Sequence, residues 1–277
     1  MQISILGCGW LGFPLAQELL ESGYNVKGST RSDEKFRLLE ENGVEAHRLT
    51  LPEDLSDCGS SSSSFWKSNT LFLNIPPGRG TENVVQSYTE KIESVRSVLE
   101  SKNSDIQQVI FASSTSVYPM EEGSFTEEMT DINNTSRPSG KAVLRAEEII
   151  CSSDQFETIV LRFGGLYGYS RHPVKQLSGR TGIKSPYKPV NLIHQRDCIR
   201  IVQTLLKSEI SSGIYNAVSD GHPPRKTLYQ SAARHYDVPE PQFDEESDSI
   251  NRIILNEKLK EEFDFSFNYP NPMDHTA

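Results

Sequence analysis

Short apolar runs alternate with amphipathic stretches through the first half of the chain. The apolar runs predict strands at Gln2–Leu6, Tyr24–Ser29, Val44–Leu49, Thr70–Ile75, Gln108–Ala112 and Thr158–Arg162. Apolar positions recur at helical spacing over Leu15–Leu20, Asp33–Glu41, Val84–Leu99 and Lys141–Ile150. Strands that alternate with helices predict an α/β fold with a parallel sheet, covered on both faces and joined by right-handed crossovers.

The pattern changes after Gly164 and Gly165. Residues 166–190 are rich in glycine, proline and cations and show no clear periodicity. Beyond them we expect strands at Val190–Ile193, Ile214–Ala217 and Arg252–Leu255, and helices at Ile199–Leu206, Lys226–His235 and from Asn256, a predicted N-cap. The pattern therefore predicts a cofactor-binding domain from the first half and a smaller substrate-facing domain from the second.

A glycine-rich turn, Gly-Cys-Gly-Trp-Leu-Gly, joins the first predicted strand to the first predicted helix. In this context GxGxxG is the fingerprint of dinucleotide binding. Gly7 permits the tight turn, Gly9 lets the backbone approach a pyrophosphate, and Gly12 lets the helix pack closely on the strand. The helix N-terminus then directs free amides at the phosphates. We expect the whole turn, with Trp10 and Leu11, to bind the cofactor.

The end of the second predicted strand bears on which cofactor is bound. An NAD site usually places an acid there, about 20 residues past the glycines, to hold the ribose hydroxyl. This chain has Ser29, Thr30 and Arg31 instead, which suit a 2′-phosphate because arginine makes forked hydrogen bonds to phosphate oxygens. Asp33 and Glu34 lie further on, where acids favour the start of a helix. We expect NADP, with NAD as the alternative.

Composition narrows the class of protein. The formal net charge of −10 disfavours binding to nucleic acid or to an anionic membrane. The chain shows neither a charged-then-apolar leader nor an apolar run long enough to span a bilayer, so we expect a cytoplasmic protein. Cys8, Cys58, Cys151 and Cys198 are scattered without a CxxC pair, and the histidines lack metal-ligand spacing. These features predict reduced thiols and no metal site.

Several ordered segments together resemble the extended short-chain dehydrogenase/reductase proteins, also called the NAD-dependent epimerase/dehydratase family. The matching segments are Gly7–Gly12, Asn74–Pro77, Ser113–Tyr118, Leu161–Gly168, Asn191–Asp197 and Gly213–Asn216. The resemblance implies a Rossmann-type doubly wound sheet over residues 1–165 and a C-terminal substrate-facing region over 166–277, with 190–217 returning to the sheet. It also implies cofactor contacts from Asn74 and Pro76. The GxGxxG spacing is shorter than the family's usual TGxxGxxG, which points to an atypical branch.

In this family a Ser or Thr, a Tyr and a Lys carry the chemistry. The hydroxyl of the first positions a substrate oxygen, the Tyr exchanges a proton with it, and the ammonium lowers the pKa of the Tyr. Ser114 matches the family's serine. Tyr118 and Tyr167 are the candidates for a replacement phenol, with packing at the wall of the site as the alternative for each.

The family's Tyr-x-x-x-Lys pair is missing from this chain. Aligning Gly140 and Glu147 with the glycine and glutamate that commonly flank the motif puts Ser139 at the Tyr position and Val143 at the Lys position. Sliding the frame so that Lys141 takes the Lys position puts Arg137 at the Tyr position. Neither frame supplies a tyrosine. A serine hydroxyl is a much weaker acid than a phenol, so the resemblance predicts a nucleotide site without standard dehydrogenase chemistry.

Residues 171–188 carry several cations and no acid within an acidic protein. In the family this region faces the substrate cleft, so an anionic or sugar-type metabolite is implied, with a solvated surface as the alternative. The expected substrate contacts are Tyr167, Arg171, Lys175, Arg180 and His194. For His194 the alternative is packing at a strand end, with Asp197 as a helix-start acid.

Two functions remain open at this point. The first is an NADP-dependent oxidoreductase or epimerase/dehydratase-like enzyme that acts on a small molecule with a rearranged acid/base. The second is a non-catalytic NADP-binding sensor or regulatory protein that keeps the fold and has lost the chemistry. Ser114, Arg162 and the basic 171–188 segment favour the enzyme, whereas Ser139 and Val143 favour the sensor. A homodimer is left open.

Overall fold

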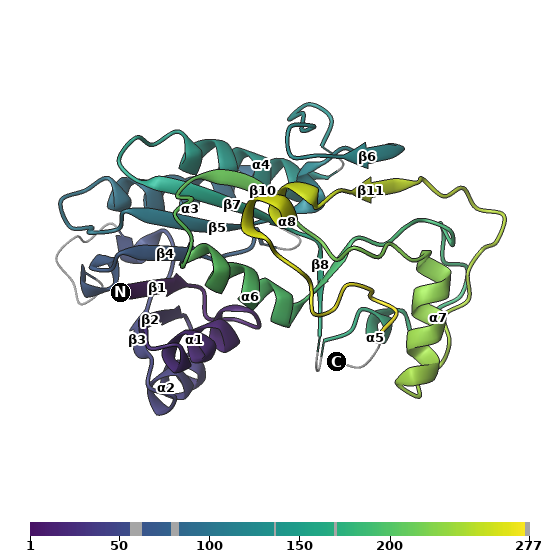
Figure 1. The fold of residues 1–277 in the computed structure, drawn as a ribbon, viewed down its shortest axis with the longest axis horizontal. Coiled ribbons are helices and arrows are strands. Elements are labelled where there is room, and N and C mark those ends of the chain that lie inside the picture. Colours follow the sequence, from purple (N-terminus) through teal and green to yellow (C-terminus); the bar gives the residue numbers. More distant parts are fainter. Residues whose placement is uncertain (56–62, 79–82, 136, 169–170, 275–277) are drawn as a thin grey trace.

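A computed structural model of the chain describes residues 1–55, 63–78, 83–135, 137–168 and 171–274. Its centre is a seven-stranded sheet in the order β10-β7-β5-β4-β1-β2-β3, with every neighbouring pair parallel (Figure 1). The strands are β1 (Gln2–Leu6), β2 (Asn25–Thr30), β3 (Glu45–Arg48), β4 (Thr70–Leu73), β5 (Gln108–Ser114), β7 (Glu157–Phe163) and β10 (Gly213–Ala217). The predicted α/β class with a parallel sheet is confirmed. The strand order reverses between β1 and β4, where such sheets bind ligands at the carboxyl ends of their strands.

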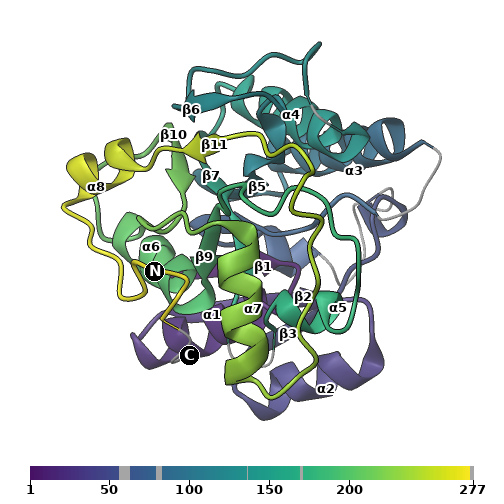
Figure 2. The ribbon, with the colours of Figure 1, turned by 90° about the vertical axis from the view of Figure 1, so that its right-hand side faces the viewer.

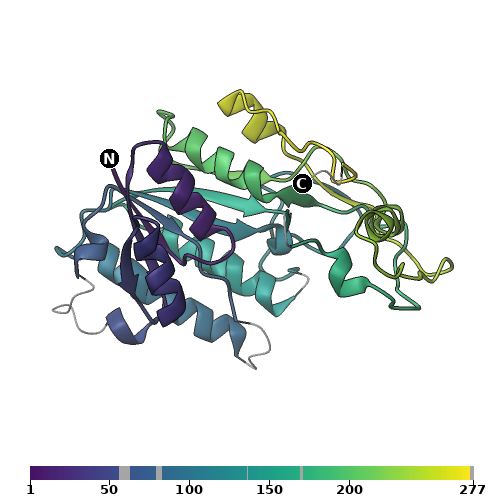
Figure 3. The same ribbon diagram turned by 90° about the horizontal axis from the view of Figure 1, so that it is seen from below.

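Helices cover both faces of this sheet. They are α1 (Gly12–Glu21), α2 (Asp33–Glu41) and α6 (Gln195–Leu205) on one face, and α3 (Val84–Leu99) and α4 (Pro138–Cys151) on the other. Figure 3 shows α1 and α6 on one side of the strands and α3 and α4 on the opposite side. Alternate residues of β5 serve the two faces, since Val109 and Phe111 pack with α3 and α4, whereas Ile110 packs with α1 and α6.

Two small parallel pairs lie outside the central sheet. In one, β6 (Gly123–Phe125) pairs with β11 (Arg252–Ile254), and in the other β8 (Gly165–Tyr167) pairs with β9 (Leu192–His194) (Figure 1). Strand β10 joins the central sheet beside β7, and α6 covers one face of that sheet. The strand expected at Val190–Ile193 behaves differently, because β9 pairs with β8 and not with the central sheet.

The remaining helices lie mostly at the far end of the molecule. Helices α5 (Val174–Leu177) and α7 (Arg225–His235) lie next to each other there and bury a third apolar cluster (Figure 2). The last helix, α8 (Glu257–Phe263), packs against β10. Single 3₁₀ turns occur at Glu53–Leu55, Ser63–Trp66 and Thr115–Val117. The Thr115–Val117 turn directly follows β5 and shapes the segment that the family resemblance associates with catalysis.

Candidate functional site

The glycine turn is held between three strands of the sheet. Gly7 has a φ of +106°, and a Cβ there would lie 2.4 Å from the carbonyl oxygen of Asn74. Its N–H donates to Oγ of Ser29 at 2.9 Å, and Nδ2 of Asn74 donates to its carbonyl oxygen at 3.0 Å. The turn after β1 is therefore fixed by residues at the ends of β2 and β4. Only glycine fits Gly7, because both the backbone conformation and the contact exclude a side chain.

The other two glycines differ from each other in what surrounds them. A Cβ on Gly12 would lie 2.3 Å from the carbonyl oxygen of Gly7, so its lack of a side chain lets α1 approach the strand. A Cβ on Gly9 would meet nothing within 4 Å, because this residue borders the pocket described next. The N-cap residue of α1, Leu11, supplies no side-chain hydrogen bond. The N-terminus of α1 and its dipole are therefore available to an anion beside Gly9.

A pocket of about 650 Å³ opens at the carboxyl ends of β1, β2 and β4. It is lined by nine of the ten residues predicted to bind the cofactor: Gly7, Gly9, Trp10, Leu11, Ser29, Thr30, Arg31, Asn74 and Pro76. Gly12, the tenth, packs beneath the turn. Among the lining residues that sequence reasoning missed are Lys35, Leu49, Leu51, Pro77 and Lys91. Lys35 was detectable, since it lies shortly after Arg31 in the first turn of the helix predicted at Asp33–Glu41. Lys91 comes from α3, and only the fold shows that it lies at the pocket.

The three residues predicted at the end of β2 have different surroundings. Ser29 is buried, and its hydroxyl oxygen accepts the Gly7 N–H, which makes it part of the turn. Oγ1 of Thr30 accepts the N–H of Ser32 at 3.3 Å. Arg31 is exposed and forms no ion pair within the described part of the chain, whereas nearby Arg48 pairs with Asp33. Arg31 is the charged residue of the three, and its guanidinium is available to a ligand.

Two residues from the second half of the chain, Leu166 and Arg171, also line this pocket. Arg171, predicted as a substrate contact, lines the pocket and holds its guanidinium carbon 4.9 Å from the ring centroid of Trp10. Nε2 of Gln195 donates to the carbonyl oxygen of Trp10 at 2.5 Å. Trp10 is therefore held by two segments of the second half. The geometry places Arg171 at the pocket of the glycine turn.

Tyr118, predicted as a catalytic phenol, is fully buried. Its hydroxyl donates to Oδ1 of Asn216 at 2.6 Å and accepts from Nη1 of Arg162 at 3.0 Å. Burial raises the pKa of Tyr118 to about 12, although Arg162 and Asn216 act in the opposite direction. Ser114, the family's serine, is partly exposed, and its Oγ accepts the N–H of Ser116 at 3.1 Å. The contacts of Tyr118 are those of a packing residue.

Arg162 forms a buried ion pair with Glu147, and the two residues are 2% and 3% exposed. Nη2 of the arginine lies 2.6 Å from Oε2 of the carboxylate, and its Nε also donates to both carboxylate oxygens. The hydroxyl of Ser113 donates to the same carboxylate, and Nη1 of Arg162 donates to the carbonyl oxygen of Glu127. The network joins β5, β7 and α4. The sequence counted Arg162 in favour of an enzyme, but its contacts are those of a residue that holds the fold together.

The start of α4 occupies the place of the missing motif. A Cβ on Gly140 would lie 2.1 Å from the carbonyl oxygen of Ser116, so this helix passes directly against the turn after β5. Val143 is buried in the apolar cluster beneath α3 and α4, and Lys141 is exposed. Ser139, one residue before Gly140, is partly exposed. The buried Val143 supplies no charge at the Lys position of the frame that Gly140 sets.

The five expected substrate residues do not come together. Tyr167 and His194 are buried with their ring centroids 5.1 Å apart, and Arg171 lies at the pocket of the glycine turn. Lys175 is exposed on α5, and Arg180 is exposed beyond it. Burial lowers the pKa of His194 to about 4, so the ring is neutral at pH 7.

His194 and Asp197 have structural contacts at the start of α6. Nδ1 of His194 accepts the N–H of Arg196 at 3.2 Å and caps the helix. The carboxylate of Asp197 accepts the N–H groups of Asn268 and Tyr269, each at 2.9 Å. Asp197 thereby fastens the C-terminal segment to α6. These contacts agree with the packing alternative for His194.

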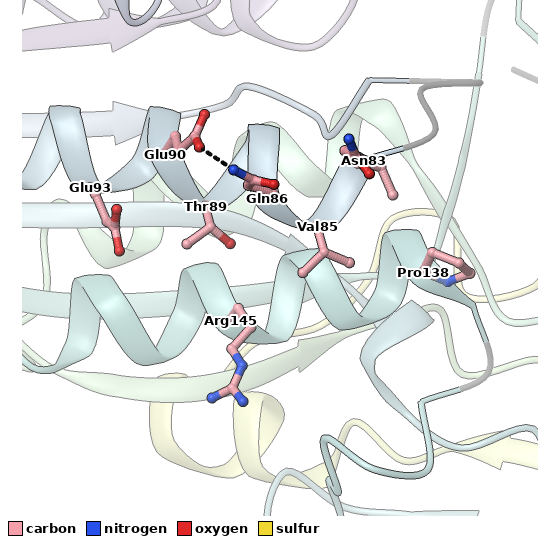
Figure 4. Close-up of a pocket in the computed structure, with 9 residues that line it drawn as sticks. Asn83, Val85, Gln86, Thr89, Glu90, Glu93, Pro138 and Arg145 are labelled. Atoms are coloured by element: carbon pink, nitrogen blue, oxygen red, sulfur yellow. Dashed lines mark hydrogen bonds between the residues drawn. The ribbon is translucent and has the colours of Figure 1, made fainter.

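A second hollow, of about 580 Å³, lies on the outer surface of α3 and α4 (Figure 4). Gln86 donates to Oε1 of Glu90 at 2.9 Å along one wall, and Arg145 stands on the facing helix. Its described lining residues come from these two helices and the positions that begin them. The hollow is thus separate from the glycine turn.

The described ranges contain neither a membrane-spanning helix nor a metal-binding group. None of the helices there has the length and apolarity to cross a bilayer. No group of three or more His, Cys, Asp or Glu side chains in the same ranges is placed to hold a metal ion. The thiols of Cys8, Cys151 and Cys198 form no disulfide, and Cys58 lies outside the described residues.

Comparisons with known proteins agree with this geometry. Residues 3–182 match the model of the NAD dependent epimerase/dehydratase family. Protein YeeZ of Escherichia coli (strain K12) is 29% identical over 276 residues, which cover 98% of this chain and 97% of that protein. UDP-N-acetylglucosamine 4-epimerase from Bacillus cereus superposes with a TM-score of 0.77 at 17% identity, covering 99% of this chain and 97% of that one. UDP-glucuronic acid 4-epimerase from Bacillus cereus, in complex with UDP-glucuronic acid and NAD, gives 0.77 at 16% identity, with coverage of 99% and 96%.

Proposed function

Because the chain belongs to the NAD-dependent epimerase/dehydratase family, we propose that it binds NADP at the glycine turn and acts on a small anionic or sugar-type metabolite. The observation that carries this proposal is the 650 Å³ pocket, which gathers the glycine turn and the uncapped N-terminus of α1. The Bacillus cereus enzyme that shares this fold is complexed with NAD and UDP-glucuronic acid, which supports a sugar-type substrate as the starting hypothesis.

The charges around the pocket support NADP over NAD. Four cations line it, Arg31, Lys35, Lys91 and Arg171, and its described lining contains no acid. Arg31 and Lys35 lie at the end of β2 and in the first turn of α2, where the ribose of a dinucleotide is held. A 2′-phosphate would meet two cations there, whereas a ribose hydroxyl would lack the acid that usually holds it.

Arg31→Ala is expected to weaken NADP binding about tenfold and to change NAD binding little. The reason is that the guanidinium would hold the 2′-phosphate, which NADP has and NAD lacks. Calorimetric titration of both cofactors into both proteins measures this. Arg48→Ala is the matched control, since Arg48 is an exposed cation on the next strand that pairs with Asp33. Equal affinity of the wild type for the two cofactors, or an unchanged Arg31→Ala, would contradict the assignment.

The chemistry proposed for this site uses Ser114 and not a Tyr-Lys pair. Bound nicotinamide supplies or takes a hydride. Ser114 follows β5 and is partly exposed, so its hydroxyl can hold a substrate oxygen. Tyr118 has its hydroxyl buried and its pKa raised to about 12, which makes it a poor proton donor to a substrate at neutral pH. Val143 offers no ammonium, so any proton transfer relies on a group outside the family's motif.

Ser114→Ala is expected to lower turnover about tenfold or more, because it removes a hydrogen bond to the reacting oxygen. Ser139→Ala, the matched serine on α4, is expected to change turnover little. The measurement is NADPH oxidation with a panel of sugar-nucleotide and small carbonyl substrates. A Ser139→Ala variant that loses activity would show that the serine is the proton donor after all.

A second function is favoured by the buried network around Tyr118 and by the apolar surroundings of Val143. On this alternative the protein is a non-catalytic NADP-binding sensor. Tight NADPH binding together with no oxidation across the substrate panel would favour the sensor over the enzyme. The division at residues 165 and 166, the cytoplasmic location and a homodimer stay predictions.

A further inference from the structure

The guanidinium of Arg171 lies over the indole of Trp10, with its central carbon 4.9 Å from the ring centroid. Both residues line the pocket of the glycine turn, Trp10 as part of the turn itself and Arg171 from the segment that follows β8. Trp10 is half-buried, and Arg171 is exposed. The pair therefore brings a charge from the second half of the chain to the turn that ends the first strand.

The start of α6 fixes the position of both members of this pair. The backbone of Arg171 exchanges two hydrogen bonds with that of Gly168, at 2.9 and 3.0 Å. Gly168 has a φ of +138°, and a Cβ there would lie 2.7 Å from Nε2 of His194, so its backbone lies directly against this ring. The next residue, Gln195, donates to the carbonyl oxygen of Trp10. Two adjacent residues thus support the arginine and its aromatic partner.

The charge of Arg171 is not balanced by a described acid. No ion pair among the described residues includes its guanidinium, whereas Arg200, a half-buried arginine on α6, pairs with Asp197. A guanidinium that lies over an aromatic ring keeps the N–H groups at its edge for other acceptors. Within the described part of the chain, the donors of Arg171 therefore remain available to a ligand in the pocket.

The glycine turn itself brings no charged side chain to a phosphate. Between its glycines it has Cys8, Trp10 and Leu11, and burial raises the pKa of the Cys8 thiol to about 12, so that this thiol is neutral at pH 7. The turn offers backbone N–H groups and the dipole of α1, which is worth about half a unit charge. The diphosphate of a dinucleotide carries a negative charge on each phosphate, so a neighbouring cation is needed to balance the rest.

The other three cations of the pocket come from different places. Arg31 and Lys35 belong to the end of β2 and the first turn of α2, and Lys91 belongs to α3 on the opposite face of the sheet. Arg171, by contrast, contacts a residue of the glycine turn. This arrangement separates the cations at the ribose end of the pocket from the cation at the turn.

We propose that Arg171 binds the diphosphate of the dinucleotide, with Trp10 as the platform that orients its guanidinium. This role deepens the proposed function and rests on it, since it requires a dinucleotide in the pocket. It gives to the cofactor a residue that the sequence analysis expects at the substrate. Arginine suits this position because it holds phosphate oxygens in a fork. Both halves of the chain then hold the cofactor.

Arg171→Met is expected to bind NADP and NAD each about tenfold more weakly than the wild type, because both carry the diphosphate. Methionine keeps an unbranched chain against Trp10, so the change removes the charge and the donors. Adenosine 2′-phosphate, which lacks the diphosphate, should bind the variant and the wild type equally. Arg31→Ala should give a different pattern, with NAD unchanged and both 2′-phosphate ligands weakened. Calorimetric titration of the three ligands into the three full-length proteins measures these affinities.

Lys184→Met is the matched control, since Lys184 belongs to the same basic segment, pairs with Asp244 and does not line the pocket. It should leave all three affinities unchanged. Arg171→Lys should bind the dinucleotides about threefold more weakly than the wild type, because lysine keeps the charge and lacks the fork. Without ligand, Arg171→Met should melt at the wild-type temperature, because the side chain is exposed. A purely structural arginine would lower that temperature and would not distinguish the ligands.

The role of Trp10 is tested by combining two variants. Trp10→Leu should weaken both dinucleotides, and adding Arg171→Met to it should cost less than about threefold further, because the guanidinium is no longer oriented. A full tenfold further loss would overturn the role of the indole as a platform.

Three outcomes of the titrations decide the assignment. Wild-type affinity of Arg171→Met for both dinucleotides would overturn it and leave the proposed function standing. A loss confined to NADP would also overturn it, because Arg171 would then hold the 2′-phosphate. A wild type that binds neither dinucleotide would overturn the proposed function and this role with it. Binding of NAD alone, weakened by Arg171→Met, would overturn only the choice of cofactor and support the role of Arg171.

Discussion

Gly9→Val is expected to abolish the binding of NADP and NAD alike while the protein keeps its wild-type melting temperature. A Cβ on Gly9 meets nothing within 4 Å, so the side chain is accommodated by the fold. It would extend into the pocket beside the N-terminus of α1, where the pyrophosphate has to lie. Calorimetry with both cofactors and thermal unfolding measure the two parts of this prediction, and the loss of affinity should exceed about a hundredfold.

Gly12→Val is the control that separates packing from binding. Its Cβ would lie 2.3 Å from the carbonyl oxygen of Gly7, so the helix would have to move away from the strand. This variant should lose stability by about 2 kcal/mol or more, as overpacked sites do. A Gly9→Val protein that still binds either cofactor would show that the glycine turn is not the phosphate site.

Glu147→Leu is expected to destabilise the protein by about 3–5 kcal/mol, because it leaves the guanidinium of Arg162 buried without its partner. The double variant with Arg162→Met should recover most of this loss, since it removes both charges together. Urea unfolding measures the free energies. Glu148→Ala is the matched control on the same helix, where the carboxylate pairs with Arg145 at the surface, and it should change stability by about 1 kcal/mol or less.

A Glu147→Leu variant as stable as Glu148→Ala would contradict this account of the network. It would mean that water or a shifted side chain satisfies Arg162 when the carboxylate is removed. Failure of the double variant to recover stability would instead show that the remaining donors and acceptors, those of Ser113 and Tyr118, depend on the ion pair for their own partners.

The central sheet was predictable because apolar runs alternate with amphipathic helices along the first half of the chain. Helix α3 runs over the predicted Val84–Leu99, and all five residues of its apolar stripe are buried: Val84, Tyr88, Ile92, Val95 and Leu99. Helix α4 starts at Pro138, three residues before the prediction, because proline is favoured in the first turn of a helix. Strands buried on both faces give continuous apolar runs, which a single sequence reveals.

Some short elements outside the central sheet were not predictable in this way. The strands β6 and β8 have three residues each and helix α5 has four, too few for a period to be visible. Asn256 does precede α8, but its side chain donates to the carbonyl oxygen of Val218 and to Asp220 and does not cap the helix. Local pattern could not reveal that these partners lie nearby.

The candidate site likewise has a part that the sequence predicts and a part that only the folded structure shows. The glycine turn was predictable because its function depends on residues that are adjacent in sequence. Tyr118 has the residue type of a catalytic acid, and only the contacts with Asn216 and Arg162 show that its hydroxyl is already used.

The pairing of early strands with late ones has a consequence for how the chain is made. Strand β7 has its outer neighbour only when β10 arrives, and β6 has a partner only when β11 has been synthesised. The carboxylate of Asp197 on α6 likewise has its two N–H donors only when Asn268 and Tyr269 have been synthesised. A nascent chain on the ribosome would therefore carry an open sheet edge at β7 until β10 has emerged, and the final packing would be completed only after release.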